Sequence, residues 1–166
     1  MTGLLNRRAF IEEAERRLAH AVRYQHPMSV LYLDLNNFKA VNDLLGHRRG
    51  DAVLHTLARL LRSKLRESDL AARMGGDEFV LILEETAMAG ALAKAQIIAD
   101  TGRRALATLG TPDKPLGLAI GVAVHPARSE GTLDSLLEAA DAAMYRAKAK
   151  GGFSVDATPE SPREHQ

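Results

Sequence analysis

The sequence predicts an α+β domain in which helices cover the faces of a central antiparallel sheet. Two apolar segments, 29–35 and 116–124, have the length and composition of buried strands. Two further apolar runs, 70–74 and 79–83, flank a Gly-Gly-Asp-Glu turn, and this arrangement predicts a β-hairpin. Longer segments with apolar residues at helical spacing lie before, between and after these strands.

Composition sets limits on domain number and on partners. The 166 residues are 46% hydrophobic, which suits one domain with a substantial core. The formal net charge of +1 argues against a nucleic-acid partner, and the absence of cysteine excludes disulfides and thiolate metal sites. No apolar run approaches the roughly 20 residues of a membrane span, and the chain opens without a signal-peptide pattern. We therefore expect a cytoplasmic domain, either free or as the cytoplasmic part of a membrane-anchored protein.

Helices are predicted by apolar stripes with a period of 3.6 residues. Asn6 can cap the first helix, which begins near Arg7 and ends before Pro27. The later helices are expected at 36–45, 51–65, 86–109 and 133–150. A Gly-Gly pair at 151–152 ends the last helix, and the polar segment 154–166 is expected to be a disordered tail or linker.

The core order of strand, helix, strand, strand, helix, strand predicts a ferredoxin-like βαββαβ fold with extra helices at both ends. In this fold the first strand pairs antiparallel with the third, so Asp34 should lie beside Asp77 and Glu78. Three carboxylates at one sheet edge repel one another unless a cation joins them, and hard oxygen ligands suit Mg²⁺. Acids in a turn are also common as simple solvated groups, so the pattern alone leaves both interpretations open.

Four motifs follow one another in the order and spacing of a known family. They are TGLLNRR at 2–8, DLNNFKAVNDLLGHRRGD at 34–51, RMGGDEF at 73–79 and DAAMYRAK at 141–148. Together they resemble the GGDEF domain of diguanylate cyclases, whose members condense two GTP into cyclic di-GMP and release pyrophosphate. The resemblance implies a GGDEF domain at 1–153, excised from a longer multidomain protein.

The resemblance also implies a metal site. Asp34, Asp77, Glu78 and the carbonyl of Leu35 would hold Mg²⁺ or Mn²⁺, and Asp77 and Glu78 would be the catalytic acids. Metal ions at the reacting oxygens stabilise the charge that builds on the departing pyrophosphate and make the attacking hydroxyl more acidic.

The same resemblance implies the contacts with the substrate. Backbone amides near Asn37 and Phe38 would hold the β- and γ-phosphates of GTP. Asn42 and Asp51 would read guanine, and Lys148 would contact a phosphate. On spacing alone, helix capping accounts for Asn42 and Asp51 equally well, and a solvated helix end accounts for Lys148.

A second nucleotide site is implied by the segment Arg66-Glu67-Ser68-Asp69. It has the Arg-x-x-Asp form of the family's product-inhibition site and lies at the family's usual distance before the Gly-Gly turn. Arginine can donate two hydrogen bonds to guanine O6 and N7, and the acid can accept from guanine N1–H. Arg66 and Asp69 are therefore the predicted inhibitory pair.

The chain departs from the family pattern at several positions. Met1 stands in place of the leucine of an opening Asp-x-Leu, Asn36 stands where many members have a second aspartate, and Ala119 replaces a common serine. Gly152 and Phe153 replace an Arg-Asn pair whose arginine contacts the triphosphate in family members. These changes keep every implied metal ligand and base reader, but they put the affinity for GTP in question.

The leading functional hypothesis is an active diguanylate cyclase. It needs a homodimer, because each subunit holds one GTP, and an upstream sensory or downstream effector domain in the full protein. The alternative is a GGDEF module that binds GTP or cyclic di-GMP without turnover and regulates an attached domain. A single-strand RNA binder is the weakest hypothesis, because four Phe and three Tyr provide no aromatic run on a strand face for base stacking.

Overall fold

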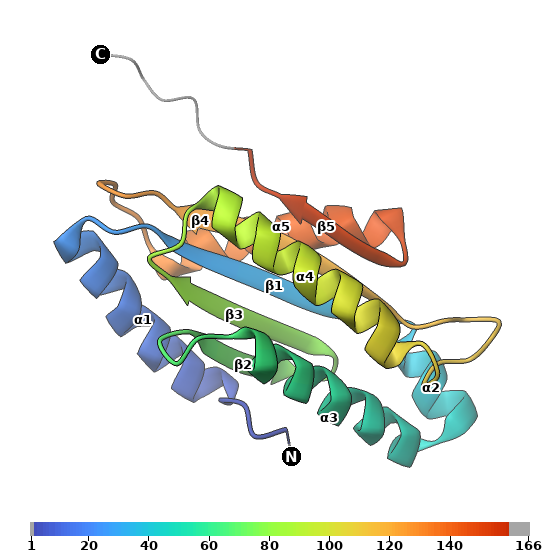
Figure 1. The fold of residues 1–166 in the computed structure, drawn as a ribbon. Coiled ribbons are helices and arrows are strands. Elements are labelled where there is room, and N and C mark those ends of the chain that lie inside the picture. The colour runs from blue at the N-terminus through green and yellow to red at the C-terminus, as the bar shows by residue number, and fades with distance from the viewer. Residues whose placement is uncertain (1, 160–166) are drawn as a thin grey trace.

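The computed structural model describes residues 2–159, which form five helices and one five-stranded sheet (Figure 1). The elements in order are α1 (Arg7–Tyr24), β1 (Met28–Asn36), α2 (Phe38–Leu45), α3 (His47–Lys64), β2 (Leu70–Gly75), β3 (Glu78–Glu84), α4 (Met88–Leu106), β4 (Gly117–His125), α5 (Leu133–Lys150) and β5 (Phe153–Ala157). The strand order is β2-β3-β1-β4-β5. The first four strands pair antiparallel, which confirms the ferredoxin-like core, and β5 joins β4 in parallel.

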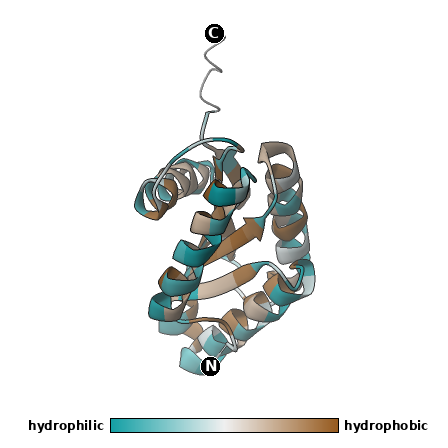
Figure 2. Cartoon of the chain, turned by 90° about the vertical axis from the view of Figure 1, so that its left-hand side faces the viewer, coloured by the Kyte–Doolittle hydropathy of each residue, from teal (hydrophilic) through white to brown (hydrophobic). Residues whose placement is uncertain are grey.

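The sheet lies between two layers of helices because its strands point successive side chains to opposite faces. Leu31, Leu33 and Leu35 of β1 pack with α2, α3 and α4, whereas Met28 and Val30 pack with α1 and α5. Figure 2 shows the hydrophobic strands in the interior with helices on both sides. Both faces of the central strand are therefore buried, and the ends of the strands provide the accessible positions for a site. Among residues 2–159, no helix is long and apolar enough to cross a membrane.

The first helix begins where the sequence predicts, and the next three begin at other residues than predicted. Asn6 caps α1 through its side chain, as predicted. The second helix begins at Phe38 and not at residue 36, because Asn37 adopts a left-handed conformation with φ of 65°. The third begins at His47, before the predicted start, directly after a glycine with positive φ. The fourth is shorter at both ends than the apolar pattern predicts.

The prediction of a disordered tail from residue 154 is wrong for residues 154–157. These residues are part of β5, which runs parallel to β4. Gly151 and Gly152, with φ of 72° and 64°, turn the chain back along the sheet after α5. The apolar side chains of β5 then pack against the core. Residues 160–166 of the predicted tail lie outside the described residues.

Candidate active site

The acidic residues of the predicted site are brought together by the pairing of β1 with β3. Asp34, close to the end of β1, is the register partner of Glu78, the first residue of β3. Leu35 N donates to Asp77 O at 3.2 Å, which fixes the tip of the β2–β3 hairpin beside the end of β1. Gly76, with φ of 30°, makes the tight turn between the two strands. The predicted antiparallel placement of the three acids is confirmed.

Each of the three carboxylates has a different environment. Asp34 is 6% exposed, and its Oδ2 accepts a hydrogen bond from Lys148 Nζ at 2.7 Å. The other oxygen, Oδ1, is buried and has no hydrogen-bond partner among residues 2–159. Glu78 Oε2 accepts from the Tyr32 hydroxyl at 3.2 Å. Burial, and then the charge of Asp34, raise the pKa of Asp77.

The three carboxylate side chains do not form one metal-binding group in this structure. Within the described part of the chain, no three His, Asp or Glu side chains lie close enough together to hold a metal ion. In this structure Lys148 pairs with Asp34 and Tyr32 pairs with Glu78, and the joint role of the three acids in metal binding stays a prediction.

The residues nevertheless fit a divalent cation. Their donors are hard carboxylate oxygens, which Mg²⁺ and Mn²⁺ prefer. The unpartnered Oδ1 of Asp34 and the raised pKa of Asp77 both indicate negative charge that is poorly compensated. A cation at this place would relieve the repulsion between the two acids.

A cleft of about 420 Å³ opens next to these acids. It is lined by Leu35, Asn37, Phe38, Lys39, Ala40, Asp43, Asp77, Lys114 and Lys148. The cleft brings together five of the predicted residues from β1, α2, the hairpin and α5, and adds two lysines that the motif assignments missed. Lys39 could have been found from its place in the first turn of a helix, beside the amides that are predicted to hold phosphates. Lys114 lies in a Pro-rich loop and carries no signal in the sequence.

The start of α2 faces this cleft and is open to an anion. Its N-cap residue, Asn37, makes no side-chain capping bond. Instead, Asn37 Nδ2 donates to Pro115 O at 2.8 Å, in the loop before β4. The first N–H groups of a helix have no partner within the helix, so those of α2 remain available to a phosphate at the positive end of the helix dipole.

Asn42 and Asp51 lie on helices that pack against each other. Asn42 is in α2, and its Oδ1 lies so close to Gly50 of α3 that a Cβ at residue 50 would be 1.8 Å away. Asp51 follows Gly50 and is exposed. Neither residue caps a helix, because α3 begins at His47 and Asn42 lies inside α2. The capping interpretation of this pair is therefore excluded, and the pair lies outside the residues that line the cleft.

The predicted inhibitory pair lies at the opposite end of β2 from the Gly-Gly turn. Asp69 is buried, and its two oxygens accept from Arg66 N at 2.9 Å and from Glu84 N at 3.3 Å. Arg66 Nη2 donates to Glu84 O at 2.7 Å and to the Thr86 hydroxyl at 3.1 Å. Asp69 thus has a structural role in the turn, whereas the exposed Arg66 is held by contacts that a ligand could replace.

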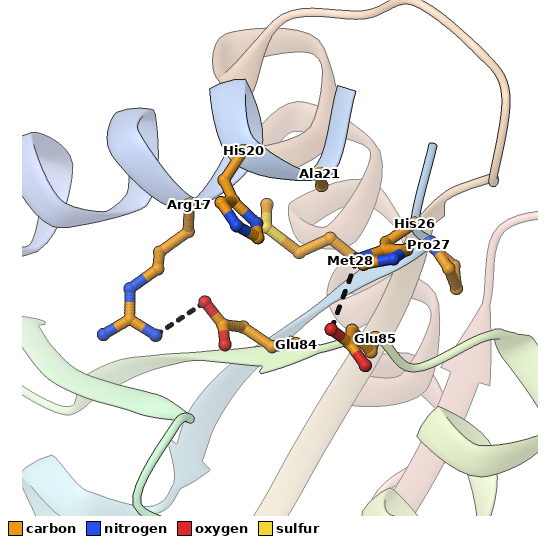
Figure 3. Close-up of a pocket in the computed structure, with 8 residues that line it drawn as sticks. All are labelled: Arg17, His20, Ala21, His26, Pro27, Met28, Glu84 and Glu85. Carbon is orange, nitrogen blue, oxygen red and sulfur yellow. Dashed lines mark hydrogen bonds and ion pairs between the residues drawn. The ribbon is translucent and has the colours of Figure 1, made fainter. Parts of the chain in front are cut away.

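A second pocket, shown in Figure 3, lies at the end of α1. Its volume is about 10 Å³, which is room for about one water molecule. Arg17 pairs with Glu84 on one side of it, and His26 lies 3.2 Å from Glu85 on the other. This pocket is too small for a nucleotide, so the cleft beside Asp77 is the candidate site.

Two departures from the family pattern touch each other beside the cleft. Asn36 Nδ2 donates to Gly152 O at 3.3 Å. The same carbonyl accepts from Leu118 N at 2.9 Å, which connects the end of α5 to the sheet. A third departure, Ala119, is fully buried against Met144 and Ala147 of α5.

The sequence matches known proteins along most of its length. The model of the family described as diguanylate cyclase, GGDEF domain, matches residues 1–153. Diguanylate cyclase DgcM of Escherichia coli K12 is 41% identical over 152 residues, which cover 91% of this chain and 36% of DgcM. The chain spans about a third of the length of the curated relatives that it matches.

Solved structures agree with the sequence match. The GGDEF domain of TpbB (YfiN) from Pseudomonas aeruginosa has a TM-score of 0.79 at 38% identity, covering 95% of this chain and 92% of that one. The coiled coil and GGDEF domain of DgcB from Caulobacter crescentus, in complex with cyclic di-GMP, has a TM-score of 0.80 at 27% identity and covers 95% and 83%. With the family match extending over residues 1–153, the chain is a member of the diguanylate cyclase GGDEF domain family.

Proposed function

We propose that this domain condenses two GTP molecules into cyclic di-GMP and releases pyrophosphate. The observation that carries the proposal is the β1–β3 register, which sets Asp34, Asp77 and Glu78 at the edge of a cleft lined with lysines. Membership of the GGDEF family supports the same activity.

The reaction forms a bond between the 3′-oxygen of one GTP and the α-phosphorus of the other. The bond from that phosphorus to pyrophosphate breaks, the hydroxyl proton is released, and a second identical condensation closes the ring. Mg²⁺ or Mn²⁺, held by Asp34, Asp77, Glu78 and the Leu35 carbonyl, would stabilise the charge on the leaving pyrophosphate and acidify the hydroxyl.

The cleft residues hold the phosphates in this proposal. The open amides of Asn37 and Phe38 at the start of α2 bind the β- and γ-phosphates. Lys148 leaves Asp34 and pairs with a phosphate, and Lys39 adds positive charge from the same helix turn as the amides. Lys148 lies in the last turn of α5, and Lys39 and the two amides lie at the start of α2.

Asn42 and Asp51 read the base. A carboxylate accepts from both guanine N1–H and N2–H₂, and adenine has neither donor in that place. The close approach of α2 to α3 at Gly50 supports this role, because it puts the two residues on adjoining turns. We therefore propose selectivity for GTP over ATP.

The reaction needs two domains, because each cleft holds one GTP. We propose a homodimer with facing clefts, and an upstream sensory or downstream effector domain would control how the two GGDEF domains meet.

We also propose product inhibition by cyclic di-GMP, which would bind at Arg66 and Asp69. GTP is a cytoplasmic nucleotide, so the domain would act in the cytoplasm even if the full protein is anchored in a membrane.

Incubation with GTP and Mg²⁺, followed by chromatography of the nucleotides, tests the proposal. We expect cyclic di-GMP from GTP and no product from ATP. Equal turnover of ATP would refute the base-reading role of Asn42 and Asp51.

The glycine at 152, in place of a phosphate-binding arginine, favours the regulatory alternative, in which the domain binds a nucleotide without turnover. Nucleotide binding without product at high protein concentration would establish that alternative.

A further inference from the structure

Lys114 is held in place by its loop, although it lies on the surface. The Thr111 hydroxyl donates to Lys114 O and accepts from Lys114 N, each at 3.1 Å. Thr111 itself is 8% exposed. One buried hydroxyl thus fixes both backbone groups of Lys114, which restricts the direction in which the side chain leaves the loop.

A second tether fixes the loop to the candidate site. Pro115, the next residue along the chain, accepts the 2.8 Å hydrogen bond from Asn37 Nδ2. Asn37 is the left-handed N-cap residue of α2, whose first amides face the cleft. Asparagine tolerates this conformation better than most residues, and here the conformation directs the side chain to the loop. Lys114 is therefore positioned relative to the same helix end that is open to phosphate.

The charge of Lys114 is available to a ligand. Lys148 is engaged with Asp34, whereas Lys114 makes no ion pair with any of residues 2–159. Both lysines line the same cleft. Gly152, where the family has an arginine on the triphosphate, contributes no charge of its own.

We infer that Lys114 binds the outer phosphates of the nucleoside triphosphate and takes over the part of the absent arginine at 152. This inference rests on the proposed function, because it assigns a residue to the same nucleotide site. Lys114 lines the cleft from the α4–β4 loop and Lys148 lines it from the last turn of α5, so the triphosphate tail would contact two lysines on different elements. The consequence is selectivity for a triphosphate over a monophosphate.

Calorimetric titration with a non-hydrolysable GTP analogue and with GMP, both with Mg²⁺, tests the inference. Lys114→Met should weaken binding of the triphosphate analogue about tenfold and leave GMP binding unchanged, since only the longer ligand reaches the loop. Lys150→Met is the control for loss of a positive charge. Lys150 is an exposed lysine at the end of α5 that pairs with Asp156 and lies outside the cleft, so its replacement should change neither affinity.

A second variant, Thr111→Val, keeps the charge of Lys114 and removes the hydroxyl that fixes its backbone. It should weaken the triphosphate analogue less than Lys114→Met does, and leave GMP binding unchanged. Equal loss for both ligands in Lys114→Met, or no loss for the triphosphate analogue, would overturn the inference while the proposed function stands. Wild-type protein that binds neither nucleotide would overturn the proposed function and the inference together.

Discussion

Lys148 Nζ lies 2.7 Å from Asp34 Oδ2, and this contact joins a proposed phosphate ligand to a proposed metal ligand. The two residues come from the last turn of α5 and the end of β1. The hydrogen bond with Asp34 raises the pKa of Lys148, so the lysine stays charged. The ammonium group therefore neutralises an acid that the proposed metal ion would otherwise neutralise. In the proposed mechanism, both residues exchange partners when metal and nucleotide bind.

Lys148→Met should tighten the binding of Mn²⁺ in the absence of nucleotide, because it removes the competing cation from Asp34. An ion pair with a half-exposed lysine contributes about 1 kcal/mol, which corresponds to about a fivefold gain in affinity. Binding of the GTP analogue should become weaker in the same variant. Titration of Mn²⁺ followed by electron paramagnetic resonance measures the first effect, with Lys150→Met as the control for charge. A Mn²⁺ affinity unchanged from wild type would mean that Lys148 does not compete with the metal.

Asp77→Asn should reduce turnover of GTP by at least about 100-fold, because metal coordination supplies several kcal/mol to the reaction and each 1.36 kcal/mol is a factor of ten. The metal-free variant should be at least as stable as wild type. The raised pKa of Asp77 means that its ionised form is disfavoured in the fold, so the charge costs stability above that pKa. Product formation and chemical denaturation measure the two effects. Wild-type turnover in the variant would remove Asp77 from the metal site.

Arg66→Ala should weaken the binding of cyclic di-GMP about 5- to 150-fold, because a bidentate guanine contact contributes about 1–3 kcal/mol. Asp69→Ala is not an equivalent probe. It leaves the N–H groups of Arg66 and Glu84 without their acceptor, and the loss of stability should be about 1–3 kcal/mol. Calorimetric titration and chemical denaturation of both variants separate the two roles. Unchanged affinity in a stable Arg66→Ala protein would show that no second site exists there.

His125→Gln should flatten the dependence of stability on pH as the pH falls below the unfolded-state pKa of about 6.5. Burial lowers the pKa of His125 in the folded protein, so the unfolded chain, with a pKa near 6.5, takes up the proton first. Stability contributed by the neutral ring is present above pH 6.5 and is lost as the pH falls towards the folded pKa. Chemical denaturation of wild type and variant at several pH values gives the free energy of unfolding as a function of pH. The other histidines are the same in both proteins, so the difference between the two curves reports His125. Parallel curves would mean that this ring does not titrate differently in the two states.

Gly152→Arg should lower stability by about 1–2 kcal/mol, because Gly152 has a φ of 64° and residues other than glycine rarely adopt this backbone conformation. No atom within 4 Å obstructs a Cβ at this position, so the cost is conformational and not steric. Gly152→Ala measures that cost alone. Any gain in affinity for the GTP analogue in the arginine variant over the alanine variant then reports contact with the phosphates. Equal affinities would show that the triphosphate does not extend to residue 152.

The sequence predicts the core strands, the ferredoxin-like order and the backbone positions of the acids, because these follow from local periodicity and from one antiparallel pairing. It does not predict β5, whose five half-buried residues resemble a polar tail until the glycines before them turn the chain. It also misses the contact of Lys148 with Asp34, which joins residues 114 positions apart. Lys114 is missed for the same reason, since its loop is related to the cleft by a long-range hydrogen bond from Asn37 to the neighbouring Pro115.

The hydrogen bond between Asn36 and Gly152 couples two positions that a family comparison treats as separate differences. An ionised aspartate at 36 has no N–H to donate, and it would face the carbonyl of residue 152 with like partial charge. An arginine at 152 would disturb the same carbonyl through its backbone. Any residue at 152 supplies this carbonyl, but its direction depends on the left-handed backbone of Gly152. Both exchanges therefore act on the same contact, and we expect their effects not to be additive. We therefore expect the stability of an evolutionary intermediate between the common family pattern and this one to depend on which of the two positions changes first.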